Sequence, residues 1–370
     1  MNADLPLQLA EDLVPVDLTE EQLFAPLTAL FNQKITKFPG TLPESLDSKN
    51  VQILRYGYVC ALKADGDRVF CLLEGSKMRM LRRNKQYKTF GLSFDLQTDF
   101  IFDAEWIEDL HLLLLFDTLL FANQPCWRLN YTHRLELAKY FLTTMIPDVE
   151  RHMYESCYIH DPPPLPSKYQ HGVTWQSPSF QVQVKPVYAP EHVAQLWNNR
   201  SLMRYNCDGI IFTRLWCTYR PFCEPTQSVM KWKPCVTIDF YVAPLAVKET
   251  VKPQIPSQFE PFICPENQST CNVVLQSVHD GALCNFSYAL IRKKVLELCL
   301  GKICEFRWNM DLSAWIVERA RLDKTSPNTL VTVFACLQSI CDKLEISDIA
   351  PLFDTSQPLH RKKKTQKLNY

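Results

Sequence analysis

Hydrophobic and polar positions along the chain change from a helical to an extended spacing after the first 33 residues. Near the N-terminus, Leu23, Leu27 and Leu30 fall on one face of a helix that starts behind a Thr19 N-cap. Further along, short apolar runs alternate with charged turns, which is typical of strands. We expect such strands at residues 51–54, 69–73, 100–102 and 112–116.

The pattern of the remaining residues predicts two further helices and a second group of strands. Residues 134–145 have helical spacing, and the proline run at 162–166 prevents that helix from continuing. A proline-dotted segment at 244–266 then separates strands on its two sides. The expected strands lie at 180–184, 210–212, 236–242 and within 270–318, and an amphipathic helix follows at 330–344.

The composition marks the chain as a globular protein of about two domains. It has 370 residues, of which 46% are hydrophobic, and its 40 Lys and Arg balance its 40 Asp and Glu. Because the net charge is zero, a polyanion would have to be met by a local basic site. This balance excludes a protein that attracts nucleic acid or a membrane through its overall charge.

Three absences in the sequence bear on where the protein works. The N-terminal residues are acidic and lack a basic and apolar leader, so we expect no signal peptide. The most apolar stretch, 110–122, is shorter than the ~18 residues of a membrane helix and includes two polar residues, His111 and Asp117. The fifteen cysteines contain no C-x-x-C pair, which argues against a zinc site and for reduced thiols. We therefore expect an intracellular protein without a membrane span.

The strongest local sign of chemistry follows an apolar run that ends at Leu62. There the chain reads Lys63-Ala64-Asp65-Gly66-Asp67-Arg68. Charged residues also follow apolar runs further along, so the motif has candidate spatial partners. These are Asp103-Ala104-Glu105, Leu115-Phe116-Asp117, Asp208-Gly209, Lys231-Trp232-Lys233-Pro234 and Arg321-Leu322-Asp323-Lys324.

Taken in order, these motifs resemble those of the covalent nucleotidyltransferases, and among them the mRNA capping guanylyltransferases more than the polynucleotide ligases. The pieces that favour capping enzymes are Phe38-Pro39-Gly40, Lys231-Trp232-Lys233-Pro234 running into Thr237-Ile238-Asp239-Phe240, and Arg321 to Asn328. The resemblance spans about residues 38 to 344. It departs from the family pattern where Ala104 replaces a glycine and Asp208 replaces the more common glutamate.

The resemblance implies an α+β architecture in two domains. An antiparallel-sheet nucleotidyltransferase domain, of the ATP-grasp-like ligase type, is expected at 1–240. A C-terminal OB-fold β-barrel is expected at 241–325, where it would close over the first domain as a lid. A terminal helix at 326–350 would pack on the first domain, and 351–370 would form a basic tail.

The chemistry that the resemblance implies needs an uncharged amine inside a cationic pocket. Lys63 would be the nucleophile, although lysine with its ordinary pKa of about 10.4 is almost wholly protonated at pH 7. Burial and the nearby positive charges of Arg68, Lys231 and Lys233 would favour the neutral amine. The same cations would neutralise the triphosphate of a bound nucleotide.

The resemblance also assigns roles around the bound GTP. Arg68 and Glu105 would hold the ribose, Phe116 would stack on the base, and Lys185 would donate to guanine O6. Two lysines, Lys231 and Lys233, would contact the α-phosphate, and Asp208 would lie near the lysine nucleophile and a Mg²⁺ or Mn²⁺ ion. Lid residues would approach the β- and γ-phosphates, namely Asp239, Arg321, Asp323 and Lys324.

The implied reaction passes GMP from GTP to Lys63 and then to a 5′-diphosphate RNA end, which forms the GpppN cap. A separate RNA triphosphatase would supply that end, and an RNA polymerase is a further expected partner. The expected location is the nucleus, or a cytoplasmic viral factory or virion if the protein is viral.

Two other functions stay open on the sequence alone. An ATP-dependent RNA or DNA ligase would use the same lysine chemistry, and a catalytically silent nucleic-acid-binding scaffold could retain the fold. Single residues have plainer interpretations as well. Taken alone, Glu105 and Asp208 fit solvated strand ends, and Phe116 fits a core position.

Overall fold

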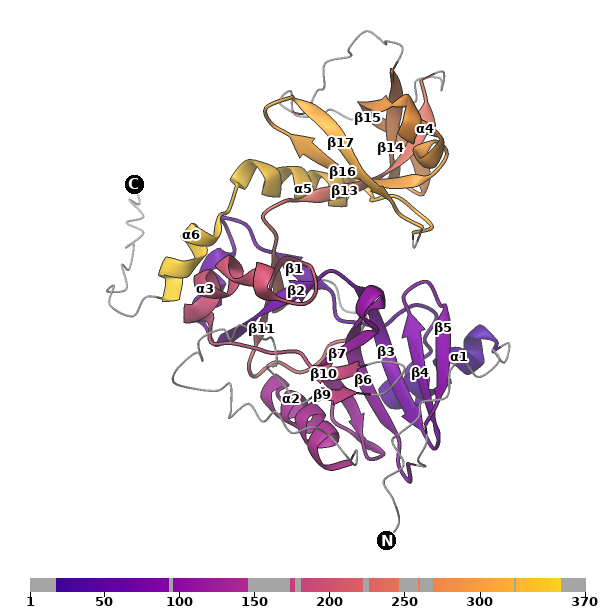
Figure 1. The fold of residues 1–370 in the computed structure, drawn as a ribbon, viewed down its shortest axis with the longest axis vertical. Coiled ribbons are helices and arrows are strands. Elements are labelled where there is room, and N and C mark those ends of the chain that lie inside the picture. The colour runs from indigo at the N-terminus through magenta and orange to yellow at the C-terminus, as the bar shows by residue number, and fades with distance from the viewer. Residues whose placement is uncertain are drawn as a thin grey trace, which may run out of the picture.

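The computed structural model shows two domains, with the N-terminal domain below and the C-terminal domain above in Figure 1. The chain enters the second domain near residue 237 and returns to the first after residue 342. The residues it describes are 18–92, 96–145, 174–176, 181–221, 226–245, 259, 269–322 and 324–353. Several predicted features lie outside these ranges, namely Asp323, the proline run at 162–166, most of the 244–266 segment and the basic tail.

The N-terminal domain is built on two sheets. The larger sheet has the strand order β5-β4-β3-β6-β7-β10-β9, with β8 paired to β7, and the smaller has the order β1-β12-β11-β2. Most neighbours are antiparallel, whereas β1 with β12 and β10 with β7 run parallel. The strands are β1 (Pro43–Ser45), β2 (Tyr58–Ala64), β3 (Asp67–Glu74), β4 (Lys77–Arg82), β5 (Tyr87–Gly91), β6 (Phe100–Ile107), β7 (Leu112–Phe121), β8 (Gln124–Pro125), β9 (Thr174–Gln176), β10 (Gln181–Val184), β11 (Cys207–Arg214) and β12 (Thr226–Trp232).

Helices cover these sheets on their outer faces (Figure 1). Helix α1 (Glu20–Phe31) begins at the predicted Thr19 N-cap, whose side chain and that of Gln22 cap each other's backbone N–H groups. Its apolar face is buried against one face of the larger sheet. The other helical segments are α2 (Tyr131–Tyr140), which continues as a π-helical turn (Phe141–Met145), and α3 (Val193–Asn198).

The strand predicted at 51–54 is wrong, because Val51–Arg55 forms a short 3₁₀ helix. Side-chain hydrogen bonds start this turn: Asp47 Oδ1 accepts from the backbone N–H groups of Lys49 and Asn50. The buried residues Val51 and Leu54 are three positions apart, which suits one face of a 3₁₀ turn. A side-chain turn in front of the segment therefore competes with the extended preference of the apolar run.

The C-terminal domain is one antiparallel sheet of five strands in the order β15-β14-β13-β16-β17. The edge strands are β15 and β17, and among the described residues no pairing closes them into a barrel, so the OB-fold stays a prediction. The elements are β13 (Thr237–Pro244), β14 (Thr270–His279), β15 (Ala282–Arg292), α4 (Lys293–Cys299), β16 (Ile303–Asn309), β17 (Ala314–Ala320), α5 (Leu330–Asp342), α6 (Ile346–Ile349) and a 3₁₀ turn (Ala350–Phe353).

Strand β13 runs across the predicted boundary between residues 240 and 241 and pairs with β14 and β16. Its alternate residues Ile238, Phe240 and Val242 are fully buried in the core of the C-terminal domain. The second domain therefore begins at Thr237, because the buried side of this strand has to face that core.

The predicted packing of the terminal helix on the first domain is wrong for α5. Leu330, Val333 and Leu337 on α5 are buried in the core of the C-terminal domain. Only the chain that follows returns to the first domain, where Ile349 and Phe353 are buried beside the smaller sheet. The amphipathic spacing located the helix, but it does not say which domain the apolar face covers.

A buried ion pair ties α2 to the larger sheet. Arg134 Nε lies 2.6 Å from Asp117 Oδ1 and Arg134 Nη2 lies 3.0 Å from Oδ2, which is the forked geometry of a strong pair. Arg134 Nη1 also donates to the carbonyl of Cys217 at 2.8 Å. The pair thus connects β7, α2 and the loop after β11.

We expect Arg134→Met to lower the free energy of unfolding by about 3–5 kcal/mol, because it leaves the Asp117 carboxylate buried without its counter-ion. Urea denaturation followed by circular dichroism measures this loss. The matched control is His133→Met on the exposed side of the same helix, where we expect a change of about 0.5 kcal/mol or less. Equal midpoints for the two variants would contradict the prediction.

Candidate active site

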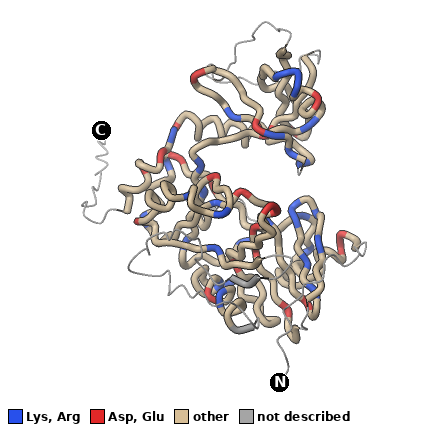
Figure 2. The backbone as a smooth tube through the Cα atoms, viewed as in Figure 1, with Lys and Arg blue, Asp and Glu red and all other residues tan. Residues whose placement is uncertain are grey.

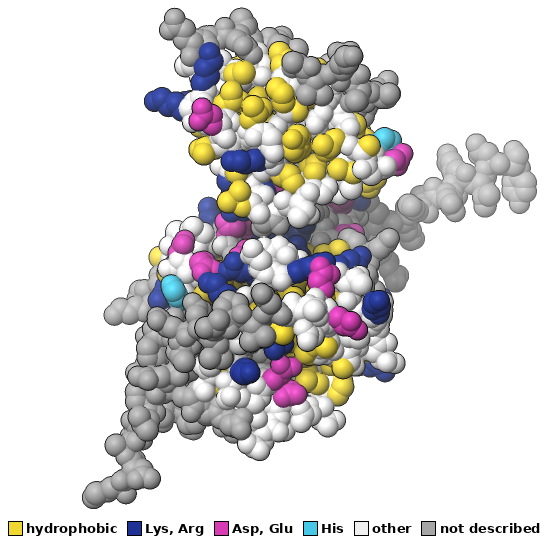
Figure 3. Space-filling model, turned by 90° about the vertical axis from the view of Figure 1, so that its right-hand side faces the viewer, with side chains coloured by type: hydrophobic (Ala, Val, Ile, Leu, Met, Phe, Trp, Pro, Cys, Tyr) yellow, Lys and Arg dark blue, Asp and Glu magenta, His cyan; other side chains and the backbone are white. Residues whose placement is uncertain are grey.

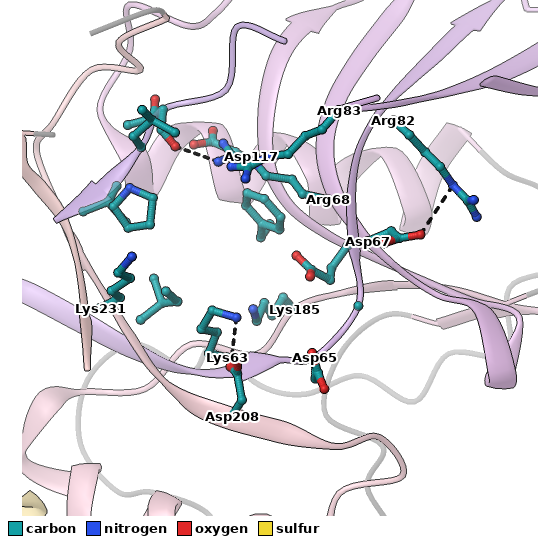
Figure 4. Close-up of a pocket in the computed structure, with 18 of the residues that line it drawn as sticks. Lys63, Asp65, Asp67, Arg68, Arg82, Arg83, Asp117, Lys185, Asp208 and Lys231 are labelled. Carbon is teal, nitrogen blue, oxygen red and sulfur yellow. Dashed lines mark hydrogen bonds and ion pairs between the residues drawn. The ribbon is translucent and has the colours of Figure 1, made fainter. Parts of the chain in front are cut away.

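Lys63 lies near the end of β2, next to β11 in the smaller sheet. Its Nζ is 2.8 Å from Asp208 Oδ1, and Lys233 Nζ is 2.5 Å from Oδ2 of the same carboxylate (Figure 4). Burial opposes the ionisation of Asp208, but the two ammonium groups outweigh it and lower the pKa of the carboxyl. Asp208 is therefore a charged bridge between two lysines that are 170 positions apart in the sequence.

Gly209 allows β11 and β12 to approach each other beside this bridge. A Cβ at position 209 would lie 2.1 Å from the carbonyl oxygen of Trp232, well inside any allowed contact. Gly209 faces Lys63 across the strand pair, next to an irregularity in the register between Cys207 and Gly209. The missing side chain thus lets residues 208 and 233 reach the same point.

Lys63 points into a cavity of about 1030 Å³ that both domains line. Lys231 and Lys185 point into the same space (Figure 4). Burial lowers the pKa of both, and the charge of Lys63 lowers each further. Among the described residues neither forms an ion pair, although the charge of Glu105 partly offsets the effect of burial on Lys185. An anionic ligand would therefore meet two cations that the protein compensates only in part.

The residues that line this cavity belong to both domains, which face each other across the waist of the molecule seen in Figures 2 and 3. Basic residues of both domains lie on the facing sides, with acidic residues among them (Figure 2). In the space-filling view, dark blue Lys and Arg side chains gather just below the waist (Figure 3). The chain is neutral as a whole, so this is the local basic site that its net charge requires.

Arg68, the last residue of the lysine motif, is held by protein groups on nearly every side. Its Nε and Nη2 donate to Asp103 at 2.9 and 2.6 Å, and its Nη1 donates to the carbonyl of Thr41 at 2.6 Å. Nη2 also lies 3.3 Å from the hydroxyl of Tyr219. The guanidinium is thus a fixed wall of the cavity and not a mobile cation.

Two other predicted residues, Glu105 and Phe116, stand beside Arg68. Glu105 on β6 lies opposite Arg68 on β3 in the antiparallel strand pair. Burial raises the pKa of the Glu105 carboxyl. The ring of Phe116 has Arg68 on one side at 5.5 Å and Lys185 on another at 5.7 Å. The structure therefore brings an acid, an aromatic ring and two cations to one end of the cavity.

The lid residues approach the cavity from the C-terminal domain. Arg321 Nη1 lies 2.9 Å from Asp239 Oδ1, and Lys324 Nζ lies 3.8 Å from Oδ2. Both cations line the same cavity as Lys63. A single ion pair between the domains, Arg319 with Asp65 at 3.7 Å, is present in the described part of the chain.

The described residues do not form a ready metal site. They contain no group of three or more His, Cys, Asp or Glu side chains placed to hold an ion. Both oxygens of Asp208, the predicted ligand, are engaged by ammonium groups. A Mg²⁺ or Mn²⁺ requirement thus stays a prediction, and no step below depends on it.

Sequence reasoning did not single out several residues of this site. Thr41 and Tyr219 surround Arg68, Arg319 reaches Asp65, and Arg83 lines the cavity with no ion-pair partner among the described residues. Their contacts join segments far apart in the sequence, and no local motif marks such contacts. The Arg82-Arg83 pair at the end of β4 was the one available signal.

No helix among the described residues is long and apolar enough to cross a membrane.

Comparison with known proteins decides the family. The family model "mRNA capping enzyme, catalytic domain" matches residues 9–235, and "mRNA capping enzyme, C-terminal domain" matches residues 265–350. The chain belongs to the mRNA capping enzyme family. The resemblance found in the sequence motifs is therefore confirmed, and the two matched regions fall on the two domains of this capping enzyme family member.

A curated protein similar to this chain is also named as an mRNA capping enzyme. The "mRNA-capping enzyme" of Danio rerio is 24% identical over 332 residues, which are 82% of this chain and 47% of that protein. This chain thus spans about half the length of that relative. Among solved structures, "Pmar-Lig_PreS3" is 16% identical with a TM-score of 0.37, over 82% of this chain and 71% of that one. A "mycobacterial DNA ligase D complexed with ATP and MES" is 11% identical with a TM-score of 0.40, over 78% and 96%.

We expect Gly209→Ala to lower the free energy of unfolding by about 3 kcal/mol, because the new methyl group meets backbone that cannot turn away. Chemical denaturation measures the change. In the control, Gly281→Ala, nothing lies within 4 Å and only the left-handed backbone is strained. That strain costs about 1 kcal/mol. A Gly209→Ala loss no larger than that of the control would show that β11 and β12 are not held this tightly.

Proposed function

We propose that this chain is an mRNA guanylyltransferase, which transfers GMP from GTP to the 5′-diphosphate end of RNA. The observation that carries the proposal is Lys63, the only lysine of its motif, set in a cavity lined by cations from both domains. Family membership supports the same reaction. The cavity also has the aromatic ring and the buried Lys185 that a guanine base would need.

In the first step the neutral amine of Lys63 attacks the α-phosphorus of GTP. A nitrogen–phosphorus bond forms, the bond from the α-phosphorus to its bridging oxygen breaks, and pyrophosphate leaves. The proton of the amine passes toward Asp208 Oδ1, 2.8 Å away, and on to solvent. Lys233 keeps its contact with Asp208, so the carboxylate stays compensated when Lys63 turns to the phosphate.

The buried lysines supply the electrostatic part of the step. Burial disfavours the charges of Lys185 and Lys231, and Glu105 offsets this only in part for Lys185, so a phosphate or base oxygen would stabilise both ammonium groups. Arg321 and Lys324 would stabilise the leaving group, which is pyrophosphate. When the lid moves onto the first domain, they exchange part of their contact with Asp239 for the β- and γ-phosphates.

In the second step a terminal oxygen of the RNA 5′-diphosphate attacks the same phosphorus. The bond to Lys63 breaks, the lysine regains a proton, and GpppN-RNA leaves. This step places the reaction after an RNA triphosphatase, which we propose as a separate partner beside an RNA polymerase. The nuclear location, with the viral alternative, is likewise a proposal.

We expect Lys63→Ala to abolish the covalent adduct that the intact chain forms with α-labelled GTP. The reason is that alanine offers no nucleophile for the phosphorus. Labelling followed by denaturing electrophoresis and peptide mapping reads the result. The control Lys77→Ala, an exposed lysine outside the cavity, should label as the wild type does.

Three results of this labelling would contradict the proposal in different ways. If the Lys63→Ala variant still formed a labelled covalent adduct, Lys63 would not be the nucleophile. Label taken from ATP and not from GTP would favour the ligase reaction. No adduct from any nucleoside triphosphate with a divalent ion would favour the silent scaffold.

We expect Arg321→Ala to slow adduct formation from GTP by about 10–100-fold, because it removes one cation that stabilises the leaving pyrophosphate. Transfer to RNA from a purified lysyl-GMP enzyme should change by less than about threefold, since no pyrophosphate leaves in that step. Single-turnover kinetics of both steps separate the two effects. The control is Arg307→Ala, which removes a surface pair with Glu318 outside the cavity. Equal losses in both steps would argue against a role in pyrophosphate release.

A further inference from the structure

The hydrogen bonds of Arg68 leave very little of its guanidinium for a ligand. An arginine side chain has five N–H donors. Two contacts go to Asp103, one to the carbonyl of Thr41 and one to the hydroxyl of Tyr219. One N–H group, on Nη1, remains for anything bound in the cavity that Arg68 lines.

Tyr219 is the centre of this network. Its hydroxyl donates to Asp103 Oδ2 at 2.5 Å and accepts from the backbone N–H of Thr41 and from Arg68 Nη2, both at 3.3 Å. The tyrosine is itself fixed from outside the cavity. Its backbone N–H donates to the carbonyl of Trp127 at 2.8 Å, and its ring stacks with that of Phe31 at 6.4 Å.

Packing prevents Arg68 from turning another edge toward the cavity. The guanidinium lies 5.8 Å from the ring centre of Phe38 and 5.5 Å from that of Phe116. The backbone of Gly40 approaches so closely that a Cβ there would lie 2.8 Å from the guanidinium carbon. The direction of the remaining N–H is therefore set by the residues around it.

We propose that Tyr219 is a positioning residue that acts on the sugar of the bound nucleotide through Arg68. The inference rests on the proposed function and on the prediction from the sequence resemblance that Arg68 contacts the ribose. With four donors occupied, Arg68 gives the ribose one directed hydrogen bond, so it recognises one hydroxyl group and not both. Tyr219 also lines the cavity, but its role in this proposal is to maintain the orientation of Arg68.

Loss of the Tyr219 hydroxyl would remove its hydrogen bonds to Asp103, to the backbone of Thr41 and to Arg68. Asp103 would lose one of its donors, and the N–H of Thr41 would lose its acceptor, although both residues are buried. Arg68 would gain a second free N–H and a less fixed orientation. Ribose recognition would then become weaker and less selective.

The test compares Tyr219→Phe with the wild type on GTP, 2′-deoxyGTP and 3′-deoxyGTP. We expect the wild type to prefer GTP over one of the two deoxy nucleotides by about tenfold, the value of one hydrogen bond to a charged donor. In Tyr219→Phe that preference should fall to about threefold or less. The half-saturating GTP concentration should rise about fivefold, with a maximal rate of adduct formation within about twofold of the wild type.

Equilibrium nucleotide binding, measured beside the kinetics, gives a readout that does not need the reaction. The matched control is Tyr58→Phe, because Tyr58 is also buried and its hydroxyl donates to the carbonyl of Gln227 outside the cavity. We expect this control to leave the preference among the three nucleotides unchanged.

Three outcomes would overturn the inference. Tyr219→Phe could lose the same factor with all three nucleotides, which marks a merely structural role, or it could keep the wild-type preference. The wild type itself could bind GTP and both deoxy nucleotides equally. Failure of the proposed function is a separate result, because the wild type would then form no adduct with GTP whatever its binding shows.

Discussion

The site depends on carboxylates that hold its cations in place before any substrate binds. Asp208 joins Lys63 to Lys233, Asp103 holds Arg68, and Asp239 holds Arg321. So many positive charges in one cavity would repel one another by several kcal/mol without such partners. Each carboxylate reduces that repulsion and also fixes the direction in which its cation points.

These three carboxylates differ in how fully they occupy the hydrogen-bond donors of their cations. Asp103 is fully buried and occupies most of Arg68, so that pair is part of the framework. Asp208 is partly exposed and shares its two oxygens between Lys63 on β2 and Lys233, which directly follows β12. Asp239 holds its cations from the C-terminal domain. Under the proposed function, the framework would surround the base and sugar of the nucleotide, whereas the more exposed pairs would surround its phosphates.

The sequence could predict elements and motif residues because both depend on local patterns. The Thr19 cap, the strand around Val69 to Leu73 and the lysine motif were found in this way. It could not predict partners such as Tyr219, which lies 151 residues from Arg68 and belongs to no local pattern. It also failed at Val51–Arg55, where hydrogen bonds of the Asp47 side chain in front of the segment favour a 3₁₀ turn over a strand.

Under the proposed function Lys63 has to be both held and released, and the shared carboxylate makes these two requirements compatible. A lysine paired with its own carboxylate would leave a bare negative charge beside the phosphates once it became neutral, and that charge would repel the substrate. Lys233 remains 2.5 Å from Asp208 and compensates this charge after Lys63 has turned to the phosphorus. The cost of freeing the nucleophile would thus be reduced by the second lysine, which β11 allows by pairing with β2 on one side and with β12, just before Lys233, on the other.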